Sequence, residues 1–288
     1  MRWRIRYPVR WRILFPSPRA RRRPDGAGRG SREFVALNPR FDAWNGRRVW
    51  IVGASTGIGA ATARLLASRG ARLALSARNE VRLREVVPGA LVLPLDVTDS
   101  AALDAAAKRM VAELGGIDLV MLNAGTYTPM RAWEFDLATV RATFEVNFLG
   151  VMNGIAAVMP QLLAQKQGAI AIVSSVAGYG GLPKSLAYGP SKAALINLAE
   201  SLYLDLAPRG IGVHLICPGF VATPLTDQND FKMPALISPE EAACEIVAGL
   251  EAGQFEIHFP KRFTRFLKFL RLLPYRLYFA IVRRTTGL

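Results

Sequence analysis

Tyr188 and Lys192 are the residues whose types and spacing best suit chemistry in this sequence. They stand four residues apart in YGPSK, at the start of a segment predicted to be helical from about 187 to 207, and this spacing places them on one helix face. A nearby ammonium lowers the pKa of a phenol from about 10, so that the phenol can exchange a proton with a substrate oxygen. Such a pair can equally lie on a solvated surface. Its position after a predicted strand that ends in Ser174-Ser175 favours a catalytic pair.

A glycine-rich turn, Gly53-Ala-Ser-Thr-Gly57-Ile-Gly59, offers a second candidate site. Glycines allow a tight turn and let backbone N–H groups approach a phosphate at the N-terminus of a helix. Glycines also mark ordinary strand-to-helix turns. Here the turn lies between a predicted strand and an apolar helical pattern, which is the context that a nucleotide site requires.

Short apolar runs alternate with longer amphipathic segments from residue 48 onward, and these elements must position both sites. Near-continuous Val, Ile and Leu runs indicate strands buried on both faces, and alternation with helices implies right-handed crossovers between parallel strands. We therefore predict an α/β fold, a single-domain Rossmann-type doubly wound parallel sheet of about seven strands flanked by helices. The predicted strands are 48–53, 71–77, 90–96, 117–125, 168–175, 211–219 and 254–259.

The spacing of the glycine turn points to a known family. It differs from the G-x-G-x-x-G of many dinucleotide enzymes and resembles the TGxxxGIG signature of the short-chain dehydrogenase/reductase family, with Val52 where that family usually has Thr. Further motifs follow in the family's order across roughly 47–258. The resemblance implies a single-domain Rossmann-type fold and a bound NAD or NADP.

The resemblance also implies roles for four residues. Tyr188 would be the general acid/base, Lys192 would additionally bind the nicotinamide ribose, and Ser175 would orient the substrate. Ser174 is the less suitable of the two serines. Asn147, in FEVNFLG, matches the asparagine that supports a proton-relay water. From the residues alone, Asn147 could instead be a structural residue that interrupts a helix.

Several short motifs resemble the cofactor contacts of the family. Asp96-Val97 matches its adenine-contacting dipeptide, although Asp96 could equally cap a helix. Asn123-Ala124-Gly125 matches its NNAG turn, with Leu122 in place of the first Asn, and Pro218-Gly219 and Thr223 match the PGxxxT segment beside the nicotinamide. The predicted cofactor-binding residues are Gly53, Ser55, Thr56, Gly57, Ile58, Gly59, Arg78, Asp96, Val97, Asn123, Ala124, Gly125, Tyr188, Lys192, Pro218, Gly219 and Thr223.

The choice between the two cofactors depends on the end of the second predicted strand. An acid there accepts hydrogen bonds from the ribose 2′-OH of NAD and repels the 2′-phosphate of NADP. The sequence reads LALSAR, with Ala77 at the acid position and Arg78 next. A guanidinium suits a phosphate in geometry and charge, although Arg78 could be a solvated surface residue. The missing acid favours NADP.

The net charge of +15 comes from the two ends of the chain. Residues 1–34 carry 11 Arg against two acids, and residues 261–288 carry eight Lys or Arg and no acid, so that 35–260 is nearly neutral. We predict a disordered Arg/Pro/Gly-rich extension over 1–34, a catalytic domain over 35–260 and a basic amphipathic extension over 261–288. Translation from near Val35 and a transit peptide are two explanations for the first segment. No nucleic-acid-binding module accompanies the charge, so nucleic-acid binding is not predicted.

The basic tail has an apolar stripe at helical spacing. Its residues are Phe263, Phe266, Leu267 and Leu270, in a predicted helix over 261–273 that Pro274 stops. Two interpretations stay open: contact with the surface of an anionic membrane, or packing on the catalytic domain as a lid or dimer contact. An interfacial tail would favour an apolar substrate, over which the loop 223–238 closes.

Other residue types narrow the prediction. Cys217 and Cys244 have no metal-like spacing, and His214 and His258 lie in apolar runs that read as strands, so we expect no metal site and no disulfide framework. This usage indicates a reducing compartment and a cytoplasmic protein, with peripheral membrane contact if the tail is interfacial. No segment of roughly 20 apolar residues is apparent in the sequence.

These features predict an NADP(H)-dependent oxidoreductase that interconverts a carbonyl and an alcohol and reduces an apolar or lipid-like ketone. Two alternatives stay open. One is an NAD-linked alcohol dehydrogenase, and the other is a non-catalytic NADP(H)-binding scaffold or sensor docked to a membrane or partner. The family resemblance also implies a homodimer or homotetramer.

Overall fold

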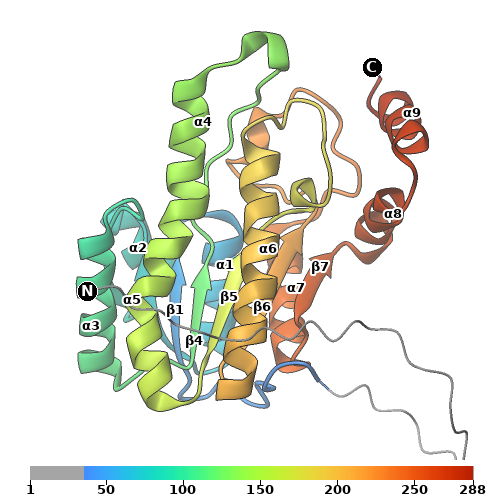
Figure 1. Ribbon diagram of the computed structural model, residues 1–288. Helices are drawn as coiled ribbons and strands as arrows, with labels where there is room; N and C mark the ends of the chain where they lie inside the picture. Colours follow the sequence, from blue (N-terminus) through green and yellow to red (C-terminus); the bar gives the residue numbers. More distant parts are fainter. Residues whose placement is uncertain (1–35, 288) are drawn as a thin grey trace, which may run out of the picture. The chain divides into compact units, whose positions relative to one another are not determined.

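A seven-stranded parallel sheet forms the centre of the protein (Figure 1). The computed structural model describes residues 36–287, so the predictions for 1–34 fall outside the described residues. The strands lie in the order β3-β2-β1-β4-β5-β6-β7. Their bounds are Arg48–Val52 (β1), Arg72–Ser76 (β2), Leu91–Val92 (β3), Leu119–Leu122 (β4), Ala169–Val173 (β5), Gly212–Pro218 (β6) and Glu256–Phe259 (β7). This is the predicted doubly wound α/β fold, with the order reversing between β1 and β4, where such sheets bind ligands.

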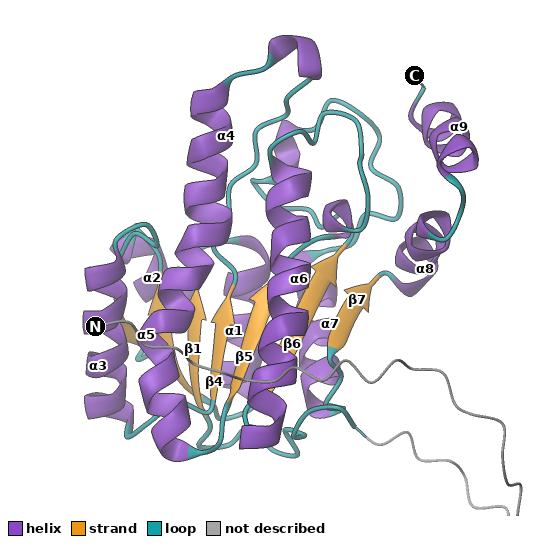
Figure 2. Ribbon diagram, in the orientation of Figure 1, coloured by secondary structure: helices purple, strands orange, loops and turns teal. Residues whose placement is uncertain are grey.

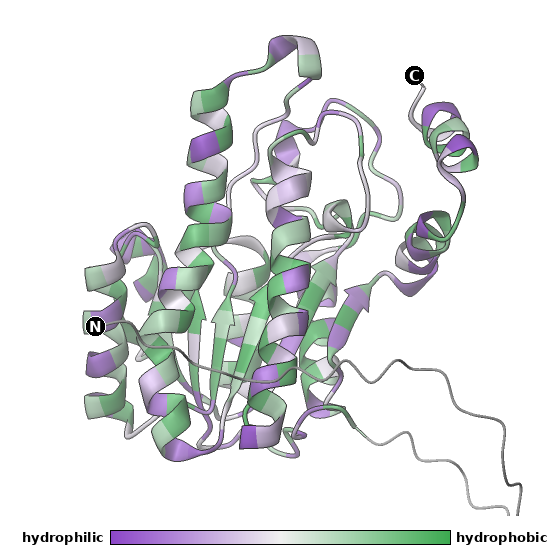
Figure 3. Ribbon diagram, in the orientation of Figure 1, coloured by the Kyte–Doolittle hydropathy of each residue, from purple (hydrophilic) through white to green (hydrophobic). Residues whose placement is uncertain are grey.

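Helices cover both faces of the sheet (Figure 2). One face packs on α3 (Ser100–Leu114), α5 (Gly150–Gln165) and α6 (Tyr188–Leu206). The other packs on α1 (Gly57–Ser68), α2 (Glu80–Val86) and α7 (Pro239–Glu251). The strands are mostly apolar because both faces of the sheet are covered (Figure 3), with the polar exceptions chiefly at strand starts and in β7.

The third strand is much shorter than its predicted range of 90–96. Only Leu91 and Val92 form a ladder with β2. Pro94 has no N–H to donate and cannot continue the ladder, although Leu93 and Leu95 still donate to Leu75 and Ala77. Prolines of this kind are tolerated on an edge strand, which is the place of β3 in the sheet.

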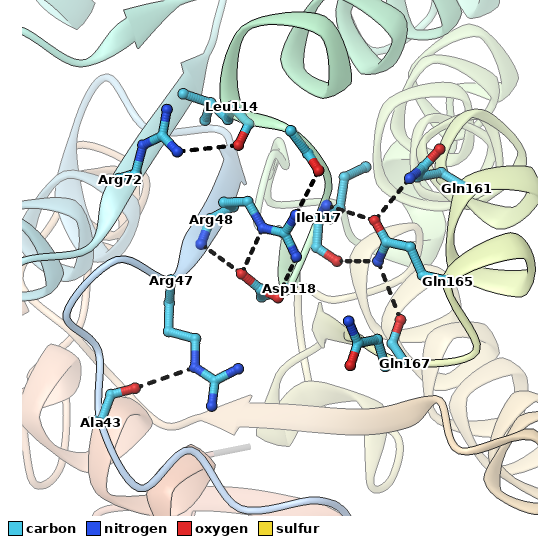
Figure 4. Close-up of polar contacts among 11 residues, drawn as sticks. Ala43, Arg47, Arg48, Arg72, Leu114, Ile117, Asp118, Gln161, Gln165 and Gln167 are labelled. Atoms are coloured by element: carbon cyan, nitrogen blue, oxygen red, sulfur yellow. Dashed lines mark hydrogen bonds and ion pairs between the residues drawn. The ribbon is translucent and has the colours of Figure 1, made fainter.

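A partly buried ion pair links β1 to β4 at the N-terminal ends of these strands (Figure 4). Two guanidinium nitrogens of Arg48 donate to the Asp118 carboxylate at 2.7 and 2.9 Å, and the backbone N–H of Arg48 donates to the same group at 2.8 Å. Burial alone would raise the pKa of Asp118, but the bonds from Arg48 outweigh it and lower that pKa. This pair therefore fixes β1 against the turn before β4.

One described helix is long and apolar enough to cross a membrane, which the sequence analysis did not foresee. It spans Leu137–Gln165 and consists of α4 (Leu137–Phe144), the π-helical turn η2 (Glu145–Leu149) and α5. A stretch of 18 residues within it has a mean hydropathy of 1.4. Val151, Ile155 and Val158 of this helix are buried in the core on one face of the sheet. It is therefore a core helix of the α/β domain.

The chain ends in two short helices beyond β7. Helix α8 (Lys261–Arg271) corresponds to the predicted amphipathic helix. Pro274 separates it from α9 (Tyr275–Thr286), a helix that the sequence analysis described only as a short apolar stretch. Four one-turn 3-10 helices complete the described elements: η1 (Ala132–Glu134), η3 (Val176–Gly178), η4 (Ala207–Arg209) and η5 (Thr226–Gln228).

Candidate active site

The glycine turn joins β1 to α1 at the point where the strand order reverses. A Cβ on Gly59 would lie 2.1 Å from the carbonyl oxygen of Gly53, and a Cβ on Gly53 would lie 2.5 Å from the nitrogen of Ala124. The Asn123 amide donates to the same Gly53 carbonyl at 2.7 Å, so the predicted Asn123-Ala124-Gly125 turn supports the glycine turn. Thr56 makes no side-chain cap at the start of α1. The turn is thus a backbone cradle open to an anion at a helix N-terminus.

Arg78 and Asp96 lie at neighbouring strand ends beside this turn. The Arg78 side chain is 84% exposed, and its nearest guanidinium nitrogen is 4.0 Å from the Asp96 carboxylate. Asp96 accepts from the backbone N–H and hydroxyl of Thr98, and these bonds with the charge of Arg78 keep its pKa below the usual value. Asp99 is the residue that caps α3. Asp96 is therefore no helix cap, and Arg78 is exposed enough to reach a bound anion.

Ser175, Tyr188 and Lys192 come together at the carboxyl end of β5. Tyr188 is the first residue of α6, and Lys192 lies one turn later on the same face. The Nζ atom of Lys192 is buried, donates to the carbonyl oxygen of Val173 at 2.9 Å and lies 5.6 Å from the centre of the Tyr188 ring. Ser175 lies near enough to the Tyr188 phenol to lower its pKa, and both side chains line the same cavity. The structure thus brings together the three residues predicted from the sequence.

The phenol pKa differs from the sequence-based expectation. Withdrawal from water raises the pKa of Tyr188 to about 12, and the nearby Ser175 only partly offsets this effect. Burial also lowers the pKa of Lys192 to about 8. The expected lowering of the phenol pKa is therefore wrong for the protein alone, because desolvation outweighs the opposing effect of Ser175. The phenol is protonated at neutral pH and is ready to act as an acid.

Asn147 lies in the π-helical turn between α4 and α5. Its side-chain oxygen accepts from the N–H of Thr126 at 2.7 Å, and its amide donates to the Thr126 carbonyl at 2.9 Å and to the Ser191 hydroxyl at 3.1 Å. A Cβ on Gly125 would lie 3.3 Å from the Asn147 oxygen and 3.6 Å from Lys192 Nζ. Asn147 is thus fully buried beside the lysine, and π turns of this kind are frequent at functional sites.

The segment after β6 closes the other side of the site. Gly219 donates to the Phe259 carbonyl at 2.7 Å. A Cβ on Gly57 would lie 2.8 Å from the Thr223 methyl group, so the predicted Pro218–Thr223 segment touches the glycine turn. Cys217 is fully buried in the sheet core, as expected for a small apolar side chain.

A cavity of about 620 Å³ opens over Ser175 and Tyr188. Tyr127 stands edge-on to the Tyr188 ring with 5.1 Å between ring centres. The loop 222–238 supplies further lining through residues such as Phe231. The outer wall comes from the C-terminal helices, and its apolar members are Phe263, Phe266, Leu267, Leu270 and Val282. The predicted apolar stripe of the tail therefore packs over the cavity, which was one of the two interpretations left open.

Three contacts that were not predicted from the sequence hold this wall in place. Glu256 of β7 accepts a hydrogen bond from the Tyr179 phenol at 2.6 Å and forms an ion pair with Lys268 of α8. The Tyr278 phenol of α9 donates to the carbonyl oxygen of Gly181 at 2.7 Å, in the loop between Ser175 and Tyr188. The residues in these contacts are far apart in the sequence. The one local signal was Glu256, an acidic residue in a mostly apolar strand, which needs a polar partner.

Among the described residues, no group of three or more His, Cys, Asp or Glu side chains could hold a metal ion. His214 is fully buried in β6, and burial lowers its pKa to about 4. His258 in β7 is half-buried and contacts the Thr264 hydroxyl at 2.6 Å. Both histidines therefore serve the packing of strands, as their apolar surroundings predict.

A phosphate cradle at the reversal point of a doubly wound sheet, next to a Ser-Tyr-Lys group at a cavity, defines a nucleotide-binding oxidoreductase of the Rossmann type. The short chain dehydrogenase family matches residues 47–233, and the chain belongs to this family. It is an oxidoreductase that interconverts a CH–OH group and a carbonyl with a nicotinamide cofactor.

Similar proteins agree with this assignment. An uncharacterized oxidoreductase of Myxococcus xanthus is 36% identical over 83% of this chain and 97% of its own length. A cis-4-hydroxycyclohexanecarboxylate dehydrogenase of Sinomonas cyclohexanicum is 37% identical over 64% of this chain and 77% of its own. Among solved structures, a short chain dehydrogenase of Burkholderia cenocepacia in complex with NADP has a TM-score of 0.74 at 27% identity, covering 83% of this chain and 98% of that one. A short chain dehydrogenase/reductase of Burkholderia phymatum in complex with NAD has a TM-score of 0.72 at 27% identity. The match covers 79% of this chain and 93% of that one.

Proposed function

We propose that the protein is an NADP(H)-dependent reductase of apolar ketones, with Tyr188 as the general acid/base. One observation carries this proposal: Ser175 and Tyr188 line a cavity whose walls are mostly apolar, and the buried Lys192 lies beneath the Tyr188 ring. We further propose that the catalytic unit spans 35–260 and that 261–288 serves it as an extension.

Proton transfer is the task of Tyr188. Its phenol is protonated at neutral pH, so in the reductive direction it gives its proton to the oxygen of a bound carbonyl. Ser175 donates a hydrogen bond to the same oxygen and orients it. Lys192 stabilises the phenolate that forms, and Asn147 holds the loop after β4 in place beside Lys192. When bound, the nicotinamide supplies the hydride in reduction and accepts it in oxidation.

The residues at the strand ends fit NADP. The Gly53–Gly59 cradle and the uncapped N-terminus of α1 would hold the pyrophosphate. Arg78 would pair with the 2′-phosphate, since it is exposed and lies near Asp96, which would face the adenine. Ala77 leaves no carboxylate to repel that phosphate. The other predicted contacts, from Asn123 to Gly125 and from Pro218 to Thr223, adjoin the same cradle.

Surface features bear on assembly and location. Large apolar side chains are exposed on two neighbouring helices. On α5 and the turn before it these are Leu149, Met152 and Leu163, and on α6 it is Leu204, which is 74% exposed. We propose that these side chains are covered by a second copy of the chain in a homodimer or homotetramer. We also propose a cytoplasmic protein that meets a membrane only at its surface, through the tail.

Fluorescence titration with NADPH and NADH, followed by turnover of a panel of apolar ketones, tests the proposed function. Tighter binding of NADPH, with turnover that Tyr188→Phe abolishes, is the expected result. NADPH binding without turnover of any ketone would favour a scaffold or sensor, and preferential NADH binding would favour an NAD-linked alcohol dehydrogenase. Failure to bind either nucleotide would overturn the proposal.

A further inference from the structure

The two C-terminal helices have two apolar sides, of which the cavity uses only one. Phe269, Leu272, Tyr275 and Phe279 do not line the cavity, are exposed, and follow one another at spacings of three or four residues. Leu272 is 82% exposed, Tyr275 is 65% exposed, and the rings of Tyr275 and Phe279 stack with 5.7 Å between their centres. Side chains of this size are normally covered when they form a continuous row.

A second exposed apolar group lies next to Arg131, a residue that lines the cavity. Trp133 is 77% exposed and Phe135 is 58% exposed, in the turn before α4. The guanidinium of Arg131 lies 5.4 Å from the centre of the Trp133 ring and also lines the cavity. Figure 1 shows this turn and helix α9 at the same end of the molecule, beyond the tips of the strands. Two exposed apolar groups therefore adjoin segments that line the cavity, one on the C-terminal helices and one in the turn before α4.

The charge of the tail identifies the partner. Its described residues include eight Lys or Arg and no acid, with Arg271, Arg276 and Arg283 all exposed around the apolar row. A second copy of the same surface would oppose like charges. An anionic lipid surface attracts them, and it also accepts Trp, Tyr and Phe rings at the level of its headgroups.

We propose that Phe269, Leu272, Tyr275 and Phe279, with Trp133 and Phe135, form a docking face for anionic lipid bilayers. Docking on this face sets the cavity mouth against the lipid, so that an apolar ketone enters from the bilayer without crossing water. This last step rests on the proposed function, whereas docking does not. Helices α8 and α9, of 11 and 12 residues, are too short to span a bilayer, so the contact is peripheral.

The experiment is flotation of the full-length protein with two kinds of vesicle. One kind contains phosphatidylcholine alone, and the other contains phosphatidylcholine with about 30 mol% of the anionic lipid phosphatidylserine. The test variant combines Leu272→Ser, Tyr275→Ser and Phe279→Ser, and Trp133→Ser tests the second exposed apolar group. Val81→Ser is the matched control, because Val81 is 66% exposed on α2, outside the docking face. Thermal melting verifies that all variants fold.

We expect the protein and the control to float with the anionic vesicles only, and the triple variant to bind about tenfold more weakly or worse. Trp133→Ser should weaken binding less. Equal flotation of the protein and the triple variant, or equal binding to both kinds of vesicle, overturns the proposal. If the protein does not bind vesicles, and light scattering shows that it is a dimer whereas the triple variant is a monomer, the face contacts a second copy of the chain instead.

A parallel assay separates docking from catalysis. Turnover of a short water-soluble ketone should be the same in the protein and the triple variant, while kcat/KM for a long-chain ketone dissolved in anionic vesicles should fall in the variant. Vesicle binding without turnover of either ketone would contradict the proposed function and leave docking intact. Unchanged kcat/KM for the vesicle-borne ketone, with docking lost, overturns substrate uptake from the bilayer.

Discussion

The Nζ atom of Lys192 lies 5.6 Å from the centre of the Tyr188 ring, and its hydrogen bond goes to the Val173 carbonyl. The ammonium is therefore held by the end of β5 beside the phenol. In the protein alone, burial controls both groups, raising the pKa of Tyr188 to about 12 and lowering that of Lys192 to about 8. Each shift has a measurable consequence.

Replacing Tyr188 with Phe removes the proton donor and keeps the ring. We expect kcat to fall about 10²- to 10⁴-fold, as for the loss of a general acid, while NADPH affinity stays within about twofold of the original protein. Tyr127→Phe is the control, because it removes the hydroxyl of the tyrosine that packs edge-on against Tyr188 and leaves the Tyr188 hydroxyl in place. Steady-state kinetics and fluorescence titration measure the two effects. An equal loss of activity in both variants would contradict the assignment of Tyr188.

The buried Lys192 should make stability depend on pH in a distinctive direction. Because its folded-state pKa is lowered from 10.5 to about 8, the unfolded chain binds a proton between these values that the folded chain does not. The free-energy cost of burying the charged Lys192 side chain is therefore largest below pH 8. It decreases as the pH rises from 8 toward 10.5, so the protein becomes more stable over this range.

Urea denaturation of the protein and of Lys192→Met at two pH values measures this cost. Relative to the variant, the protein should gain about 1.5 kcal/mol in free energy of unfolding between about pH 8 and pH 9.5. A constant difference would show that the lysine titrates at its ordinary pKa.

Arg78 should decide between the two cofactors. Arg78→Ala removes the partner of the 2′-phosphate, and we expect NADPH to bind about 10- to 100-fold more weakly, the effect of losing a charged hydrogen bond. NADH binding should not change. Arg82→Ala is the control, since Arg82 is an exposed arginine on α2, four residues further along. Parallel weakening of NADPH and NADH in Arg78→Ala would argue against contact with the phosphate.

The C-terminal wall should select substrates by size. Phe266→Ala removes a ring that lines the cavity, so kcat/KM for a bulky apolar ketone should fall about tenfold, within the range for a lost apolar contact. A ketone too small to reach the wall should react as before. Phe269→Ala, on the other side of the same helix, is the control and should leave the reaction of both soluble ketones unchanged.

The sequence predicts the parts of the site that depend on local patterns. The glycine turn and the Tyr188–Lys192 pair each lie within one turn or helix, and the motifs of the family place Ser175 beside them. The strands could be located because burial on both faces makes them continuously apolar. The length of β3 was overestimated because Pro94 removes a ladder bond from an apolar run.

Other features depend on contacts between distant residues. Tyr179 and Glu256 are 77 positions apart, and nothing in the local sequence of either predicts their bond. The direction of the Tyr188 pKa shift depends on how much protein surrounds the phenol, which is a property of the whole fold. The stripe of α8 could equally have faced lipid or protein, because an amphipathic pattern does not identify what covers it.

The position of the cavity wall in the chain has a practical consequence. The cofactor cradle and the Ser-Tyr-Lys group are complete before residue 224, whereas the wall lies on helices that follow the last strand. Exchanging only the segment after Pro260 for that of a related enzyme would therefore replace the outer wall of the cavity and leave the core on both faces of the sheet untouched. The C-terminus is the natural site at which to redesign the range of ketones that this protein accepts.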